Sequence, residues 1–108
     1  MRETFCEYIH KLRCENGMTL TKLAAALDID QSTLSKIENG KRKIPVEILP
    51  KLSSVFNIDL RNLEHEYFSE IIAKIIYTQD EPNQLLRAAE EKAKYMRIRN
   101  NKQRTINF

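Results

Sequence analysis

Two short stretches with apolar residues at helical spacing, joined by only three residues, constrain this fold more than any other feature of the sequence. They cover residues 20–27 and 31–39, and recurrence at three- and four-residue intervals predicts an amphipathic helix for each. Their apolar residues are Leu20, Leu23, Ala24 and Leu27, then Leu34 and Ile37. Helices joined by so short a turn cross steeply and share a small apolar contact, so the first turn of the second helix projects outward.

The flanking residues support these boundaries. Phe5, Ile9 and Leu12 predict a preceding helix over residues 4–16, which Gly17 ends by accepting a left-handed conformation. The next two helices have good N-cap residues in Thr19 and Asp30.

The rest of the chain is also predicted to be helical. A fourth helix runs over residues 46–56, with Pro50 either in its first turn or marking a later start. Asp59 caps the next segment, where Leu60 and Leu63 close the core. Helical spacing continues from residue 64, breaks at 80–83 and resumes in a last helix over about 82–99, with 100–108 frayed.

The predicted fold class is therefore all-α, with a compact head over 1–63 and a helical hairpin extension over 64–108. With two Gly and three Pro, few tight turns are available, and no stretch alternates with the period of a strand.

Charge is distributed unevenly. Residues 31–51 hold five basic and two acidic side chains, residues 64–91 two basic and seven acidic, and residues 92–104 six basic and no acidic ones. A basic patch, an acidic middle and a basic tail indicate separate roles for these segments. The tail is interpreted first as a soluble helix end, where cations are favourable, and second as an additional DNA or partner contact.

Several function classes find no support. Cys6 and Cys14, two helical turns apart, are too distant for a disulfide and are interpreted as small buried or half-buried thiols of a reducing cytosol. No metal-ligand spacing links them to His10 or His65, which are interpreted as isolated. No apolar run reaches membrane-spanning length, and nothing groups a nucleophile with a base. We expect a cytoplasmic protein that is not an enzyme, with no metal and no cofactor.

The sequence resembles the Cro/cI-type (XRE-like) helix-turn-helix family over about residues 4–63. The matching residues are Gly17-Met18-Thr19, Leu23-Ala24, Leu27, Ile29 to Lys41, Leu49 to Leu52 and Ile58-Asp59-Leu60, of which the run Leu-Ser-Lys-Ile-Glu-Asn-Gly-Lys is the most specific. The resemblance implies a five-helix, lambda-repressor-like fold, a homodimer, and a double-stranded DNA operator of two half-sites.

The resemblance also implies roles for individual residues. Bases are read by Gln31, Ser32, Thr33 and Lys36, side chains able to recognise base edges in the major groove. Phosphates are held by Asn39, Lys41, Arg42 and Lys43. Glu38 would repel phosphate and is expected to brace the fold.

Two residues depart from the family pattern. Leu20 replaces a Gln that contacts phosphate, so Thr19 or Lys22 must supply that contact. Asp28 replaces a Gly in the turn, a change that the fold tolerates because Asp accepts the left-handed region better than most residues.

The apolar stripe beyond residue 63 has two interpretations. Its members are Tyr67, Phe68, Ile71, Ile72, Ile75 and Ile76. Either the last helix folds back and covers it with Leu85, Leu86, Ala89 and Met96, or it forms a dimer interface, and both can hold together. The expected function is a sequence-specific transcriptional regulator, a repressor or autoregulator, that binds an inverted repeat as a dimer. The alternative is an antitoxin or restriction-modification control protein whose residues 64–108 bind a protein partner.

Overall fold

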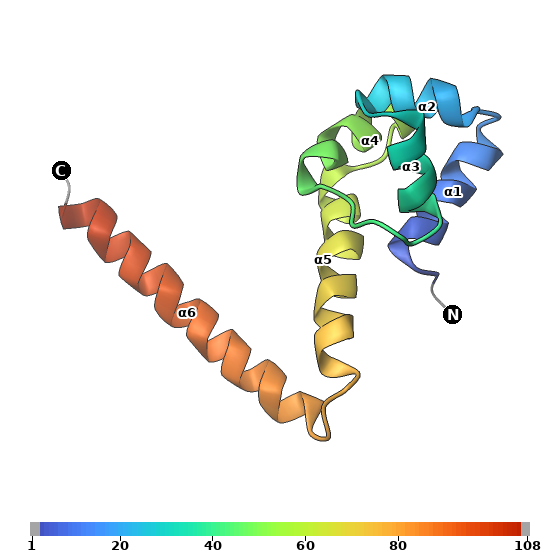
Figure 1. Ribbon diagram of the computed structural model, residues 1–108. Coiled ribbons are helices and arrows are strands. Elements are labelled where there is room, and N and C mark those ends of the chain that lie inside the picture. Colours follow the sequence, from blue (N-terminus) through green and yellow to red (C-terminus); the bar gives the residue numbers. More distant parts are fainter. Residues whose placement is uncertain (1–2, 107–108) are drawn as a thin grey trace. The chain divides into compact units, whose positions relative to one another are not determined.

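The computed structural model describes residues 3–106, with side chains described as far as residue 101, and every regular element in this part of the chain is helical (Figure 1). The all-α class is confirmed. The chain divides into two compact units with the boundary after Ile71.

The first unit contains the expected series of short helices. They are α1 (Phe5–Glu15), α2 (Leu20–Leu27), α3 (Gln31–Glu38), a 3-10 turn η1 (Val46–Ile48), α4 (Leu49–Phe56) and the start of α5 (Leu60–Ile76). The predicted fourth helix over 46–56 is split, because Pro50 lies in the first turn of α4 and the residues before it form η1. The later helix start is therefore the correct alternative.

Local capping explains most of these boundaries. Thr4 forms a capping box with Glu7, and the Thr19 hydroxyl accepts a hydrogen bond from the Lys22 amide at 3.1 Å. Asp30 occupies the N-cap of α3 as expected, but its side chain makes no capping hydrogen bond. Asp59 accepts a hydrogen bond from the Arg61 amide at 2.9 Å at the start of α5.

Asp28 shows how a non-glycine residue closes the tight turn between α2 and α3. Its φ is 59° and its ψ is 45°, in the left-handed region, and its amide donates back to the last turn of α2. The fold therefore keeps the turn that the family makes with Gly, as predicted.

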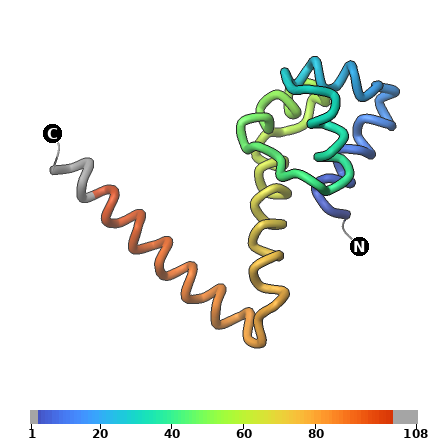
Figure 2. Tube along the Cα trace, in the orientation of Figure 1, coloured from blue at the N-terminus to red at the C-terminus, as the bar shows by residue number. Residues whose placement is uncertain are grey.

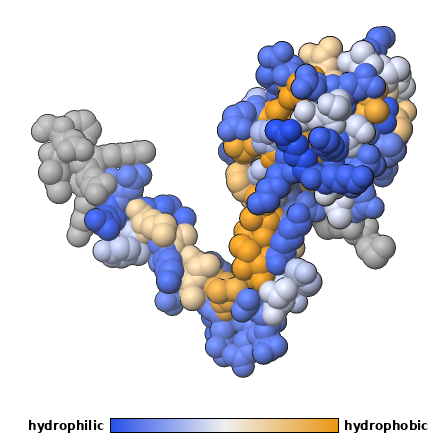
Figure 3. All heavy atoms as spheres, viewed as in Figure 1, coloured by the Kyte–Doolittle hydropathy of each residue, from blue (hydrophilic) through white to orange (hydrophobic). Residues whose placement is uncertain are grey.

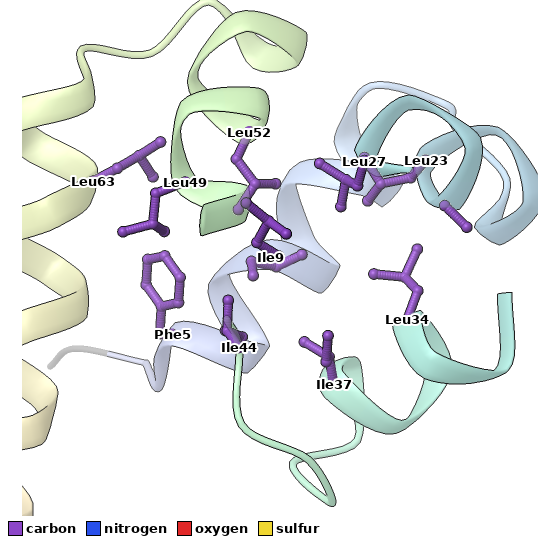
Figure 4. Packing of buried hydrophobic residues seen from close by; sticks show 12 residues of the cluster. Phe5, Ile9, Leu23, Leu27, Leu34, Ile37, Ile44, Leu49, Leu52 and Leu63 are labelled. Carbon is purple, nitrogen blue, oxygen red and sulfur yellow. The ribbon is translucent and has the colours of Figure 1, made fainter. Parts of the chain in front are cut away.

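One apolar core holds the first unit together, and its side chains converge from all of these helices (Figure 4). The fully buried ones are Ile9, Leu23, Leu27, Leu34, Ile37, Leu49, Leu52 and Leu63. Each contributes about 1.5–3 kcal/mol by leaving water, so the core fixes the positions of α2 and α3.

The first unit extends past the expected boundary at residue 63. The Tyr67 hydroxyl on α5 donates to the Ile44 carbonyl oxygen at 2.7 Å, and its ring lies edge-on to Phe5 at 5.6 Å between centroids. A Glu70 carboxylate oxygen accepts a hydrogen bond from the Phe5 amide at 3.0 Å, at the start of α1. Tyr67, expected in the exposed stripe, thus packs against the core.

The second unit contains the end of α5 and α6 (Pro82–Ile106). The expected fraying from residue 100 is wrong as far as Ile106, and residues 107–108 lie outside the described residues. Leu85 and Met96, expected to cover the stripe, are 36% and 65% exposed, and Ile72 and Ile75 are 46% and 53% exposed. Within this unit these apolar side chains are left uncovered. None of the described helices is long and apolar enough to cross a bilayer.

Candidate nucleic-acid interface

The first two turns of α3 divide into a buried and an exposed side. Leu34 and Ile37 have no exposed surface, whereas Gln31, Ser32 and Lys36 are exposed. Thr33 is half-buried. Figure 2 follows the backbone through α2, the turn and α3, the segment that presents these side chains. The core thus fixes one side of α3 and leaves three of the four predicted base-reading residues open to solvent.

Gln31 is held in place by a residue that sequence reasoning missed. The Thr21 hydroxyl on α2 donates to Gln31 Oε1 at 2.8 Å. The bond leaves the Gln31 amide nitrogen available as a donor and restricts the rotamers of the side chain. Leu20, at the position where the family has Gln, is instead half-buried and packs against the core. The sequence offered one signal for this role of Thr21. Its hydroxyl lies in the first turn of α2, next to Leu20, which departs from the family pattern.

The last residue of α3 is anchored to α1 by an ion pair. Arg13 donates from Nε to Glu38 Oε2 at 2.8 Å and from its second terminal nitrogen to Oε1 at 3.0 Å. Its first terminal nitrogen donates to the Met18 carbonyl at 2.9 Å. The Glu38 and Arg13 side chains are 5% and 14% exposed, so Glu38 braces the fold, as expected.

The electrostatics of this pair follow from its contacts. Burial acts to raise the pKa of Glu38, but hydrogen bonds and charges from Arg13 and His10 outweigh it and hold that pKa below its usual value. The hydrogen bond to Glu38 raises the pKa of Arg13.

Two interpretations of α1 were wrong. His10 is not isolated, because its Nδ1 lies 2.7 Å from Glu38 Oε1. Cys14 is not buried or half-buried but exposed, while Cys6 is half-buried. The His10–Glu38 contact is not visible in the sequence, because α1 and the end of α3 are more than twenty residues apart.

The basic loop follows α3 directly. Gly40 has a φ of 74°, and the Lys41 amide donates to the Lys36 carbonyl at 2.8 Å, which closes the end of α3. The side chains of Lys41, Arg42 and Lys43 are exposed, as is Asn39 at the C-cap. The loop therefore offers three cations and an amide beside α3.

Thr19 and Lys22, predicted to replace the missing Gln contact, are exposed at the start of α2. The Thr19 oxygen already accepts the Lys22 amide hydrogen bond, but its hydroxyl hydrogen is still available as a donor. Arg42 and the half-buried Thr33 line the same surface hollow, together with Asp28 to Asp30 and Pro45. The structure thus brings the loop and α3 to one surface.

Fold and surface together define a helix-turn-helix protein: two short crossed helices on a common core, with an exposed polar turn and a basic loop. A family model described as helix-turn-helix matches residues 9–63, about half of the chain. The chain belongs to this family, the Cro/cI-type (XRE-like) helix-turn-helix proteins of transcription regulation.

Individual relatives match little more than half of this chain. The uncharacterised HTH-type transcriptional regulator RghRB of Bacillus subtilis is 37% identical over 60 residues, 55% of this chain and 43% of its own length. The HTH-type transcriptional regulator DdrOP3 of Deinococcus deserti is 34% identical over 58 residues, 54% of this chain and 45% of its own. The matches thus span less than half the length of either relative. Among solved structures, the SinR protein/SinI protein complex aligns with a TM-score of 0.49 and 24% identity, over 87% of this chain and 98% of that one.

Proposed function

We propose that this protein is a sequence-specific double-stranded DNA-binding transcriptional regulator that acts as a dimer on an inverted repeat and represses the genes beside it. The observation that carries the proposal is the exposed first turn of α3. There the Thr21 hydroxyl holds the Gln31 side chain by a hydrogen bond to its Oε1 at 2.8 Å. The transcription regulators similar to this chain agree with it.

The exposed side chains suit the major groove. The amide of Gln31 pairs with the Hoogsteen edge of adenine, and Lys36 donates to O6 or N7 of guanine. Ser32 and Thr33 supply hydroxyls, and the Thr33 methyl contacts a thymine methyl. These four residues are the proposed base-reading set.

Phosphate contacts come from both ends of the motif. At one end are Lys41, Arg42, Lys43 and Asn39 in the loop, and at the other Thr19 and Lys22 at the start of α2. Contacts at two separated points fix the register of α3 in the groove, and sequence is then read by the four residues between them.

Selection of bound duplexes from a random pool tests the proposal. We expect an inverted repeat whose half-sites are centred about 10–10.5 base pairs, or a multiple of this, apart. We also expect the logarithm of the affinity to fall linearly with that of the salt concentration. Repression is measured with the selected site placed across the promoter of a reporter gene. No salt-dependent duplex binding at any concentration would contradict the proposal.

The dimer is proposed to form through the exposed stripe on α5. Phe68, Ile71, Ile72 and Ile75 stand at i, i+3, i+4 and i+7, so they share one face of the helix, and each is 44–53% exposed. Figure 3 shows the apolar band that α5 presents to solvent. A second copy is the proposed occupant, because an isologous contact pairs the stripe with itself and supplies the two-fold symmetry that an inverted repeat requires.

The same stripe supports a second candidate function, capture of a different protein by residues 64–108, as in an antitoxin or a restriction-modification control protein. Light scattering with size exclusion separates the two. A dimer of the full chain supports the first candidate. A monomer that also fails to protect both halves of the selected repeat would contradict it and favour the second.

A further inference from the structure

Three side chains at the junction of α1 and α3 form a chain of contacts that DNA binding does not use. Cys14 Sγ lies 3.6 Å from Nε2 of His10, one helical turn earlier on α1. Nδ1 of the same ring lies 2.7 Å from Glu38 Oε1 on α3. The order is carboxylate, imidazole, thiol, with an exposed sulfur at its end.

The short contact to Glu38 decides the tautomer of His10. An imidazole nitrogen 2.7 Å from a carboxylate oxygen must carry the proton, because two acceptors at that distance repel each other. In the neutral ring Nε2 then carries the lone pair, and it faces the sulfur of Cys14. A nucleophile within reach of a base that a third group orients is the arrangement that activates thiols in proteins.

A fourth side chain, Arg13, contacts the same carboxylate. Its terminal nitrogen lies 3.4 Å from His10 Nδ1 while donating to Glu38 Oε1 at 3.0 Å. The pKa of Arg13 is raised first by its hydrogen bond to Glu38, and the charges of Glu38 and Cys14 add to this. Arg13 thus helps to hold the carboxylate that orients the His10 ring.

We propose that Cys14 is a reactive thiol that exchanges with small disulfides of the glutathione type. The thiol proton passes to Nε2 of His10, and the thiolate attacks one sulfur of the small disulfide. A new S–S bond to Cys14 forms as the old one breaks. The departing thiolate leaves as the reduced small thiol, taking a proton from His10 or water.

The exchange also reaches the DNA-binding surface, a consequence that rests on the proposed function. A group attached to Sγ lies beside Nε2, and we expect it to displace the His10 ring from Glu38. Glu38 is the last residue of α3 and precedes the basic loop. We expect the Cys14 adduct to bind the selected duplex several-fold more weakly than the reduced protein.

The test is the rate of adduct formation at each cysteine of the full chain, measured by mass spectrometry of peptides after incubation with oxidised glutathione. Cys6 is an internal reference on the same helix. We expect Cys14 to react about tenfold faster than Cys6, because Cys14 is exposed and has His10 beside it as a base, whereas Cys6 is half-buried. The His10→Gln variant should slow Cys14 by about the same factor and leave Cys6 unchanged.

Unfolded protein supplies a comparison that needs no variant. In concentrated urea the two cysteines should react alike, and native Cys14 should exceed that common rate. A native Cys14 no faster than in urea, or an unchanged rate in a folded His10→Gln protein, would overturn the proposal. These rates are measured without DNA, so failure of the reduced protein to bind any duplex contradicts the proposed function alone. If the Cys14 adduct binds the duplex as tightly as the reduced protein does, the proposed effect on α3 is contradicted. The proposed reactivity of the Cys14 thiol is then unaffected.

Discussion

Single side chains in this protein connect stability to the DNA-binding surface. The Arg13–Glu38 pair ties α1 to the end of α3, and the Thr21–Gln31 bond ties α2 to its beginning. Side-chain contacts therefore fix each end of α3, with His10 also reaching Glu38, while the core fixes its middle. Because a shift of about 1 Å misaligns a bidentate base contact, these two contacts bear on recognition as well as on folding.

The Glu38 carboxylate should make stability depend on pH. Its pKa is held below the usual 4.5 because Arg13 and His10 outweigh the effect of burial. Its stabilising contribution is thus complete above the unfolded-state pKa and is lost as pH falls through the lower folded-state value. Urea unfolding between pH 7 and pH 3 should show this loss in wild type.

Glu38→Gln should reduce the free energy of unfolding at pH 7 by about 1–2 kcal/mol, since the half-buried Arg13 is left without its counter-charge. The variant should also lose that part of the acid dependence. Glu47→Gln, at an exposed position outside the pair, is the control. Equal stability of Glu38→Gln and wild type at pH 7 would show that the ion pair contributes nothing.

The proposed base-reading and the proposed phosphate-binding residues should have different effects in binding measurements. Gln31→Ala and Lys36→Ala should each cost about 1–3 kcal/mol on the selected site and relax base preference at one position. Lys41→Ala and Lys43→Ala should weaken all duplexes alike and lower the salt slope by about one unit each. Fluorescence anisotropy on the selected and scrambled duplexes measures both effects. A Gln31→Ala loss that is equal on the two duplexes would remove Gln31 from the base-reading set.

At the scale of helices, local chemistry made α1, α2 and α3 predictable. Thr19 caps α2 and Gly17 takes a left-handed conformation after α1, both within one turn of their own positions, so helix ends could be inferred from sequence to within a residue. The contacts of Arg13 and Thr21 could not be inferred in the same way. They join elements through single side chains, and such pairings leave no periodic pattern. The end of α6 was missed because a run of polar and basic residues is compatible with both helix and coil.

The turn between α2 and α3 gives a prediction about a single residue, Asp28, whose backbone conformation closes that turn. Asp28 has a φ of 59°, where a β-branched side chain is strained. Asp28→Val should lower the free energy of unfolding by about 1–2 kcal/mol, measured by urea titration. Asp28→Gly removes the same carboxylate without strain and should stay within about 0.5 kcal/mol of wild type. A loss as large in Asp28→Gly would assign the effect to the carboxylate rather than to the backbone.

At the scale of the whole molecule, the sequence left two interpretations of the apolar stripe open. The structure changes which residues belong to this stripe. Tyr67 belongs to the core of the first unit, bonded to Ile44, whereas Phe68, Ile71, Ile72 and Ile75 remain exposed. Periodicity could not make this distinction, because a core-facing and a partner-facing stripe on one helix have the same spacing. Ile76 is half-buried, so the proposed dimer depends on four residues rather than six.

Ile72→Glu tests that dimer. A carboxylate in a stripe that meets its own copy places two like charges in an apolar contact, so we expect the dissociation constant of the dimer to rise by at least about 100-fold. Ile72 is already 46% exposed, and the folding of the first unit should be unaffected by circular dichroism and thermal melting. Light scattering over a range of concentrations measures the shift.

Ala73→Glu, one residue on and exposed on another face of α5, should remain as dimeric as wild type. If both variants stay dimeric, the stripe is not the interface. If both become monomeric, the charge on α5 matters but its face does not. Affinity for the full inverted repeat should fall with the dimer in Ile72→Glu, while affinity for an isolated half-site should not change, because the reading side chains on α3 are untouched.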